Sequence, residues 1–76
     1  MKIKITNKIE DKITEYQVKY GSSRTWIANK AGISRQNLNS LENSDNPTIQ
    51  SLARIAYALG CEITDLYECK IIEDGF

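Results

Sequence analysis

The sequence predicts a small all-α domain of five helices, with a short antiparallel ribbon where the two chain ends can meet. Three observations support this fold class. Apolar residues recur at helical spacing through most of the chain. Glycines stand at positions 21, 32 and 60, where three of the helices would end. Apolar and polar residues alternate only near the two ends. The 76 residues are expected to form one domain, 1–76, with a small core.

Residues 24–43 describe two short helices that meet at a tight corner. Gly32 can enter the left-handed conformation that ends the first helix. Ser34 is a good N-cap for the second helix, and Ile33 before it can pack on Leu38 as a hydrophobic staple. The residues expected on the buried faces of both helices are Ile27, Ala28, Ala31, Leu38 and Leu41. This spacing predicts a helix-turn-helix.

One helix is expected before this motif. Asn7 and Glu10 have the spacing of a capping box at its start, and Ser23 is the expected N-cap of the motif's first helix. The apolar face of the leading helix would consist of Ile9, Ile13, Tyr16 and Tyr20.

Two helices are expected after the motif. Thr48 is a plausible N-cap for the first of them, and a short fifth helix over residues 63–67 would add Leu66 to the core. The expected buried face of the fourth helix is Ile49, Leu52, Ala53, Ala56 and Leu59.

The terminal extensions, residues 1–6 and 68–76, lack the helical spacing of apolar residues found in the rest of the chain. Residues 2–5 and 68–72 alternate as strands do, and they can pair within one chain or between two copies. Residues 73–76 are expected to fray, although Phe76 could dock.

The pattern as a whole resembles the Cro and phage-repressor (XRE-type) helix-turn-helix family over roughly residues 7–67. The resemblance implies a lambda-repressor-like domain that binds double-stranded DNA by placing the helix 34–43 in the major groove. Four residues depart from the family's common form: Arg24 stands where Gln is common, Trp26 where a capping Glu is common, Ser44 where Gly is common, and Asp45 where Lys or Arg often contacts phosphate. The loop from Glu42 to Pro47 is also one residue shorter than the common form. The residues that carry the resemblance are Ile27, Ala28, Ala31, Gly32, Ile33, Leu38 and Leu41, with a downstream match at 42–43, 46–48, 52, 55–56, 58–60 and 63–66.

Long or polar side chains with hydrogen-bond donors suit the base edges of the major groove, where Arg pairs best with guanine and Gln or Asn with adenine. The expected base-reading residues are Arg35, Gln36, Asn37 and Ser40, of which the resemblance itself implies Arg35, Gln36 and Ser40. The expected contacts to the DNA backbone are Ser23, Arg24, Ser34, Asn39 and Asn43, with Arg24 and Asn43 implied by the resemblance. The alternative reading of these side chains is a solvated helix face.

The net charge is zero, but its distribution is uneven. Residues 1–35 carry eight Lys or Arg and three acids, a net charge of +5, whereas residues 36–76 carry two Lys or Arg and seven acids, a net charge of −5. The basic half includes the first helix of the motif and the start of the second, the side expected to approach phosphates.

Other function classes lack support in the sequence. The chain has no His, no Gly-rich phosphate loop and no cluster of side chains at metal-ligand spacing, so no enzyme activity, cofactor or metal is expected. No apolar run approaches the roughly 20 residues of a membrane span, which leaves a cytoplasmic protein by default. Cys61 and Cys69 are expected to be reduced. The expected function is a homodimeric transcriptional repressor on a palindromic operator; the alternative is a protein-interaction module, such as an antitoxin or the partner of another regulator.

Overall fold

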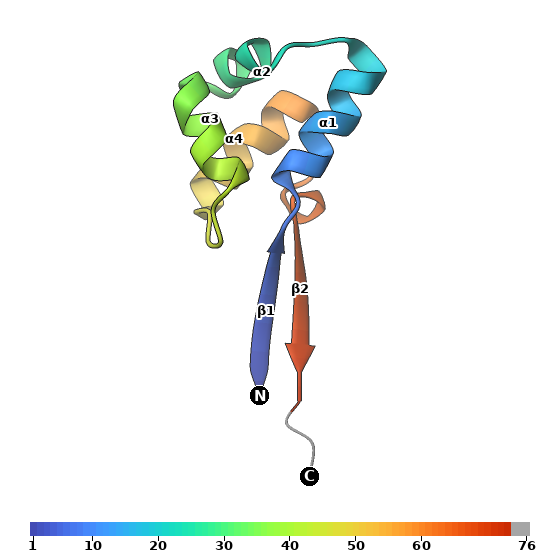
Figure 1. Ribbon diagram of the computed structural model, residues 1–76, viewed down its shortest axis with the longest axis vertical. Helices are drawn as coiled ribbons and strands as arrows, with labels where there is room; N and C mark the ends of the chain where they lie inside the picture. The colour runs from blue at the N-terminus through green and yellow to red at the C-terminus, as the bar shows by residue number, and fades with distance from the viewer. Residues whose placement is uncertain (74–76) are drawn as a thin grey trace.

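The computed structural model describes residues 1–73, and within them four helices form one body from which two strands project as a single arm (Figure 1). The molecule is elongated, with extents of 49 × 22 × 17 Å. The elements in chain order are β1 (Lys2–Asn7), α1 (Ile9–Tyr20), α2 (Arg24–Ala31), α3 (Arg35–Glu42), α4 (Ile49–Leu59), the 3-10 turn η1 (Ile63–Asp65) and β2 (Tyr67–Ile72). None of the described helices is both long and apolar enough to span a membrane.

A single apolar cluster holds the helical body together. The helix α4 packs against α2, α1 and η1, and α3 packs against α2 and α1. Ile33 lies half-buried against this cluster, as expected of the residue before the N-cap of α3. The buried members are Ile9, Ile13, Ile27, Ala28, Ala31, Leu38, Leu41, Leu52, Ile55, Ala56, Ala58 and Leu66.

Three of the predicted N-caps are confirmed. The hydroxyl oxygens of Ser23, Ser34 and Thr48 each accept a hydrogen bond from the backbone N–H three residues on, at 3.0, 3.0 and 3.1 Å. The corner between α2 and α3 is closed by Gly32, whose φ of 73° lies in the left-handed region. These caps fix where both helices of the predicted helix-turn-helix begin and where α2 ends.

The predicted capping box at the start of α1 is wrong. The N-cap is Lys8, and Glu10 lies exposed on the surface. The Asn7 side-chain oxygen accepts from the backbone N–H two residues on, at 2.8 Å, while its amide nitrogen donates to the carbonyls of Leu41 (2.8 Å) and Ser44 (2.7 Å). Asn7 therefore ties the start of α1 to the end of α3 through its amide nitrogen, while its oxygen bonds the first N–H of α1 instead of forming a capping box.

The predicted apolar faces of α1 and α4 are partly wrong. Tyr20 is 59% exposed and packs its ring on Tyr16 with centroids 4.6 Å apart, instead of entering the core. Ile49 and Ala53 are exposed, and the buried residues of α4 are Leu52, Ile55, Ala56 and Ala58. Since α4 carries apolar residues on most of its circumference, its periodicity could not show which stripe faces inward.

The predicted fifth helix is replaced by the three-residue turn η1. The backbone N–H of Leu66 donates to the carbonyl of Ile63 at 3.0 Å, and the chain then enters β2. Leu66 is nevertheless completely buried, as expected. Its carbonyl accepts from the N–H of Lys8 at 2.9 Å, which brings the two chain ends together at the base of the arm.

The two strands pair with each other within the chain, so the expected antiparallel ribbon is confirmed, and its pairing, which the sequence left open, is intrachain. The pairing is antiparallel and runs from Lys2 opposite Ile72 to Asn7 opposite Tyr67, one or two residues longer than expected in each strand. Glu73 follows without regular structure. The expected fraying of residues 74–76 and the docking of Phe76 lie outside the described residues.

Candidate nucleic-acid interface

The outward face of α3 is polar and exposed. Leu38 and Leu41 occupy the buried side of the helix, and at about 100° per residue Gln36 lies opposite the middle of that side. Arg35 and Asn37 lie toward the two borders of the outward face. The exposed side chains of α3 and its C-cap are Arg35, Gln36, Asn37, Asn39, Ser40 and Asn43.

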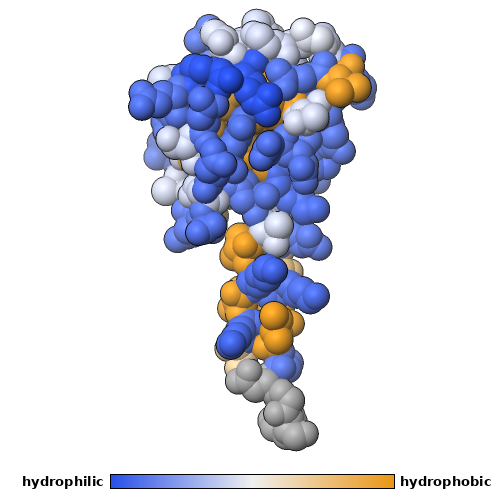
Figure 2. Space-filling view, viewed as in Figure 1, coloured by the Kyte–Doolittle hydropathy of each residue, from blue (hydrophilic) through white to orange (hydrophobic). Residues whose placement is uncertain are grey.

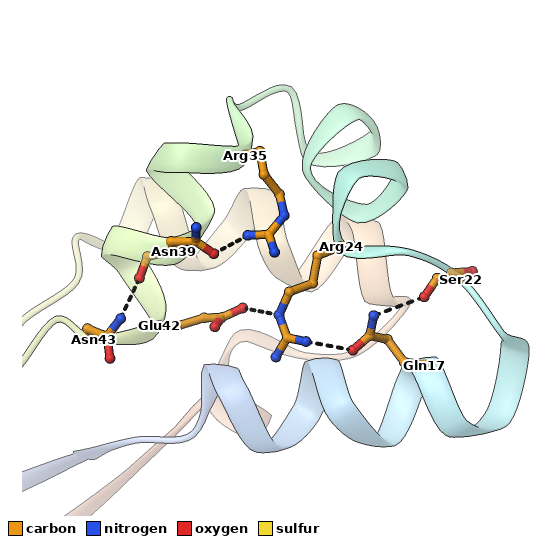
Figure 3. Close-up of polar contacts among 7 residues, drawn as sticks. All are labelled: Gln17, Ser22, Arg24, Arg35, Asn39, Glu42 and Asn43. Atoms are coloured by element: carbon orange, nitrogen blue, oxygen red, sulfur yellow. Dashed lines mark hydrogen bonds and ion pairs between the residues drawn. The ribbon is translucent and has the colours of Figure 1, made fainter.

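Three of these residues are linked in a row along the helix. The Arg35 guanidinium donates to the side-chain oxygen of Asn39, and the Asn43 amide donates to the Asn39 carbonyl at 2.9 Å (Figure 3). The three residues lie four positions apart and therefore share one side of α3. This row orders long polar side chains that would otherwise move freely in solvent.

Ser23 and Ser34 lie at the N-terminal ends of α2 and α3. Both side chains are used as N-caps, which occupies a lone pair on each oxygen and leaves the hydroxyl proton able to donate. Each residue is exposed. The positive end of each helix dipole adds to the attraction for an anion at these positions.

Arg24 lies half-buried between α1 and α3 and is held by two acceptors. Its Nε donates to Glu42 Oε1 at 2.9 Å, and its Nη1 donates to Gln17 Oε1 at 2.8 Å; Gln17 in turn donates to the Ser22 carbonyl at 3.1 Å (Figure 3). The Arg24 side chain is 25% exposed and that of Glu42 only 9%. The charge of Arg24 is therefore matched by a neighbouring carboxylate before any phosphate approaches.

Gln17 and Glu42 are the residues at this interface that sequence reasoning missed. Gln17 lies on α1 and Glu42 on α3, whereas Arg24 begins α2, so no periodicity within one helix links them to it. The sequence carried only one hint, the departure at Arg24 from the residue common in the resembling family.

Trp26 belongs to the joint between α1 and α2. Its ring stacks on Tyr16 of α1 at a centroid distance of 6.2 Å, with the ring planes 17° apart, and the ammonium of Lys30 lies 5.1 Å from its centroid. Trp26 therefore packs against a neighbouring helix. Trp26 remains 44% exposed.

The loop after α3 carries the acidic residue that departs from the resembling family. Asp45 is exposed, and the Ser44 hydroxyl accepts from the backbone N–H of Asn46 at 3.1 Å, which tightens the turn. A carboxylate here repels phosphates, so this loop contributes less to DNA affinity than a basic loop would.

Two groups with shifted pKa values lie away from α3. Burial raises the pKa of the Cys61 thiol, and the hydrogen bond from Lys12 to Glu15 raises the pKa of that ammonium. Within residues 1–73, no three His, Cys, Asp or Glu side chains are grouped so that they could hold a metal ion.

Comparison with known proteins identifies a family. No curated protein sequence is significantly similar to this chain. The family model described as the Cro/C1-type HTH DNA-binding domain matches residues 9–70, a range that contains all four helices. This confirms the resemblance indicated by the sequence, and the chain belongs to the Cro/C1-type helix-turn-helix DNA-binding domain family.

Proposed function

We propose that this protein is a homodimeric repressor that inserts α3 of each copy into the major groove of one half of a palindromic operator. Membership of the family makes it a DNA-binding transcription regulator whose partner is double-stranded DNA. The finer assignment rests chiefly on one observation, the continuous exposed polar face of α3 opposite Leu38 and Leu41.

The proposed base-reading residues are Arg35, Gln36, Asn37 and Ser40. Gln36 is central on the outward face, so it would reach deepest into the groove and suits adenine. Arg35 suits guanine, and its bond to Asn39 aligns the guanidinium along α3 before DNA is bound. Asn37 lies at the border of the face and would contribute least.

The proposed backbone contacts are Ser23, Ser34, Asn39 and Asn43, which lie at the ends of α2 and α3 or along the row described above. Arg24 remains a candidate but would contribute less than a free arginine, because Glu42 already compensates its charge. One fewer effective cation lowers both the affinity and its dependence on salt.

Repression follows from occupation of the operator. Two copies with their α3 helices about 34 Å apart would enter successive major grooves on one side of the duplex. A bound dimer would then exclude other proteins from that stretch of DNA. The two-fold symmetry of the pair would require a near-palindromic site.

The test is selection of bound duplexes from a random DNA pool at near-physiological salt. We expect the natural protein to enrich a two-fold symmetric site and the Arg35→Ala/Gln36→Ala variant to lose that enrichment. The matched control is Thr14→Ala/Lys19→Ala, which removes the same charge from exposed positions of α1 and should still enrich the site. If neither the natural protein nor the control enriches any sequence, operator recognition by this chain is refuted.

A protein-interaction module is the second candidate, favoured by a specific surface. Ile49 and Tyr57 are each 71% exposed on α4, and Ala53 between them is also exposed, so an apolar stripe faces outward. An antitoxin or a partner of another regulator would use such a stripe with DNA contact secondary. DNA affinity that changes little with salt would favour this candidate, because phosphate contacts make affinity fall steeply as salt rises.

A further inference from the structure

The arm formed by β1 and β2 has two chemically different faces. Residues directly opposite in an antiparallel pair point to the same side of the ribbon, and successive residues alternate. The register therefore places one set of side chains, the apolar face, on one side: Ile3, Ile5, Asn7, Tyr67, Cys69 and Ile71, of which only Asn7 at the base of the arm is strongly polar. The other set, the lysine face, consists of Lys2, Lys4, Thr6, Glu68, Lys70 and Ile72.

The apolar face is uncovered within the described chain. Ile3 is 59% exposed, Ile5 43% and Ile71 58%, and none of them belongs to the core cluster. The arm projects beyond the helical body, and apolar surface is visible along it (Figures 1 and 2). A two-stranded ribbon alone is marginally stable in water and needs a further apolar layer. Something outside the helical body is needed to cover this face.

We propose that the occupant is the arm of a second copy, packed apolar face to apolar face across a two-fold axis. This inference rests on the homodimer of the proposed function and names its interface. The apolar face carries no charged side chain, so two such faces can meet without burying a charge. The lysine face cannot do the same, because Lys4 lies directly opposite Lys70 and stacking two copies would bring four such ammonium groups together.

Two further features fit a second copy. Tyr67 packs half-buried against the core at the base of the arm, so the apolar face is continuous with the helical body and the arm is anchored in a fixed direction. In the face-to-face arrangement the lysine faces point outward on both sides of the pair. They stay hydrated and prevent the paired arms from adding a third copy.

The small area of the apolar face limits the affinity of the dimer. Six residue pairs make a ribbon about 20 Å long, and two strands make it about 10 Å wide. Such a face is well below the about 800 Å² that each partner buries in a standard stable interface. The free protein should therefore dimerise weakly, and binding of two copies to adjacent half-sites should be cooperative.

Neighbouring residues of β2 provide a matched test. Ile71 lies on the apolar face and Ile72 on the lysine face, and both are substantially exposed. In sedimentation equilibrium from low micromolar to near-millimolar protein, Ile71→Lys should raise the dimer dissociation constant at least about tenfold, because it places an ammonium group in the apolar contact between the arms. Ile72→Lys should change it less than about threefold, as expected for a rim residue. The fluorescence of Trp26 should show that both variants keep the helical body folded.

Thiol alkylation gives an independent measurement. Cys69 lies on the apolar face, and Cys61 lies half-buried outside the arm, so the two thiols can be compared within one sample. The alkylation rate of Cys69 relative to Cys61 should fall as protein concentration rises, and Ile71→Lys should abolish this fall. Both rates follow from mass spectrometry of the same digest.

Several outcomes would overturn the proposed interface. The first is that the natural protein stays monomeric at all concentrations. The second is that Ile71→Lys and Ile72→Lys raise the dimer dissociation constant equally. The third is that Tyr57→Lys on α4 dissociates the dimer while Ile71→Lys does not. Failure of the proposed function looks different. If the protein dimerises through the arm but enriches no DNA site, the proposed interface stands and the proposed operator recognition fails. If Ile71→Lys binds a half-site but loses cooperativity, both the interface and the operator recognition are supported.

Discussion

The ion pair between Arg24 and Glu42 should contribute measurably to stability, because it joins the start of α2 to the end of α3. The Nε–Oε1 distance is 2.9 Å, and the two side chains are 25% and 9% exposed. Exposed pairs contribute about 0.2–1 kcal/mol, while loss of one partner from a fully buried pair costs about 3–5 kcal/mol. Arg24 keeps its second acceptor, Gln17, so Glu42→Ala should lower the free energy of unfolding by about 2 kcal/mol.

Thermal and urea unfolding followed by circular dichroism would measure this loss. For a domain of this size, 2 kcal/mol corresponds to a fall in Tm of roughly 8–16 °C. A double-mutant cycle with Arg24→Ala should give a coupling free energy of at least about 1 kcal/mol. Glu68→Ala is the control: Glu68 pairs with Lys8 at 3.6 Å and is 65% exposed, so its removal should cost less than about 1 kcal/mol. Coupling between Arg24 and Glu42 below about 0.5 kcal/mol would refute the reasoning.

The same variant should act in the opposite direction on DNA binding. Removing the carboxylate of Glu42 leaves the Arg24 charge uncompensated near the start of α2. The slope of the logarithm of DNA affinity against the logarithm of salt should become steeper by about one phosphate contact. A slope unchanged within error would show that Arg24 does not approach the DNA backbone.

Three further predictions concern stability and reactivity. Asn7→Ala removes three hydrogen bonds, two to the carbonyls of Leu41 and Ser44 at the end of α3 and one from the backbone N–H of Ile9, and should cost about 2–4 kcal/mol in urea unfolding; a loss below about 1 kcal/mol would contradict its role in joining α1 to α3. Gly32→Ala and Gly21→Ala should each cost about 1–2 kcal/mol, because both positions have a left-handed backbone, with φ of 73° and 70°. The new methyl group at Gly32 meets only the end of the Arg54 side chain, which can move aside; a much larger loss at Gly32 would show that this side chain is fixed. At low protein concentration and pH 7–8, Cys69 should alkylate faster than Cys61, since burial raises the pKa of the Cys61 thiol and keeps it protonated there; the difference should narrow as pH rises through that raised pKa, and equal rates at pH 7 would contradict it.

The helix boundaries of the motif were predictable because each is set by local chemistry. Ser23, Ser34 and Thr48 act as N-caps through atoms only three residues away, and Gly32 ends α2 by a backbone conformation that other residues resist. Strand pairing at the chain ends followed from alternation, although the choice between pairing within one chain and between two did not. Local rules therefore gave the elements but not all of their partners.

The errors arose where long-range contacts override local preference. Asn7 and Glu10 have the spacing of a capping box, yet Lys8 is the N-cap and the Asn7 amide donates to carbonyls more than thirty residues away. Ile49 and Ala53 were wrongly expected in the core, and they could be excluded from it only by knowing which side of α4 meets α2. The expected fifth helix shortened because β2 begins at Tyr67 to meet β1, a constraint set by the opposite end of the chain.

The candidate site shows the same division. The outward face of α3 followed from the positions of Leu38 and Leu41, since whatever is not buried on a short helix must face out. The hydrogen-bond partners of Arg24 could not be predicted from the sequence, because they come from two other helices. Assigning Arg24 to phosphate from its position alone overlooked the carboxylate that compensates it.

Charge at the interface has a consequence for how a single copy can bind. The outward face of α3 carries one cation, Arg35; the charge of Arg24 is compensated by Glu42, and Asp45 adds a repulsion in the following loop. Phosphate contacts supply most of the affinity of nonspecific DNA binding and much of that of specific binding, so one copy should hold DNA weakly. Two copies joined by their arms make the second binding event intramolecular, which raises the effective concentration of the second α3 without any new contact to DNA. Discrimination between operators would then depend on the arm as much as on the side chains that read the bases, and a monomeric variant should lose affinity for full sites while keeping its preference among half-sites.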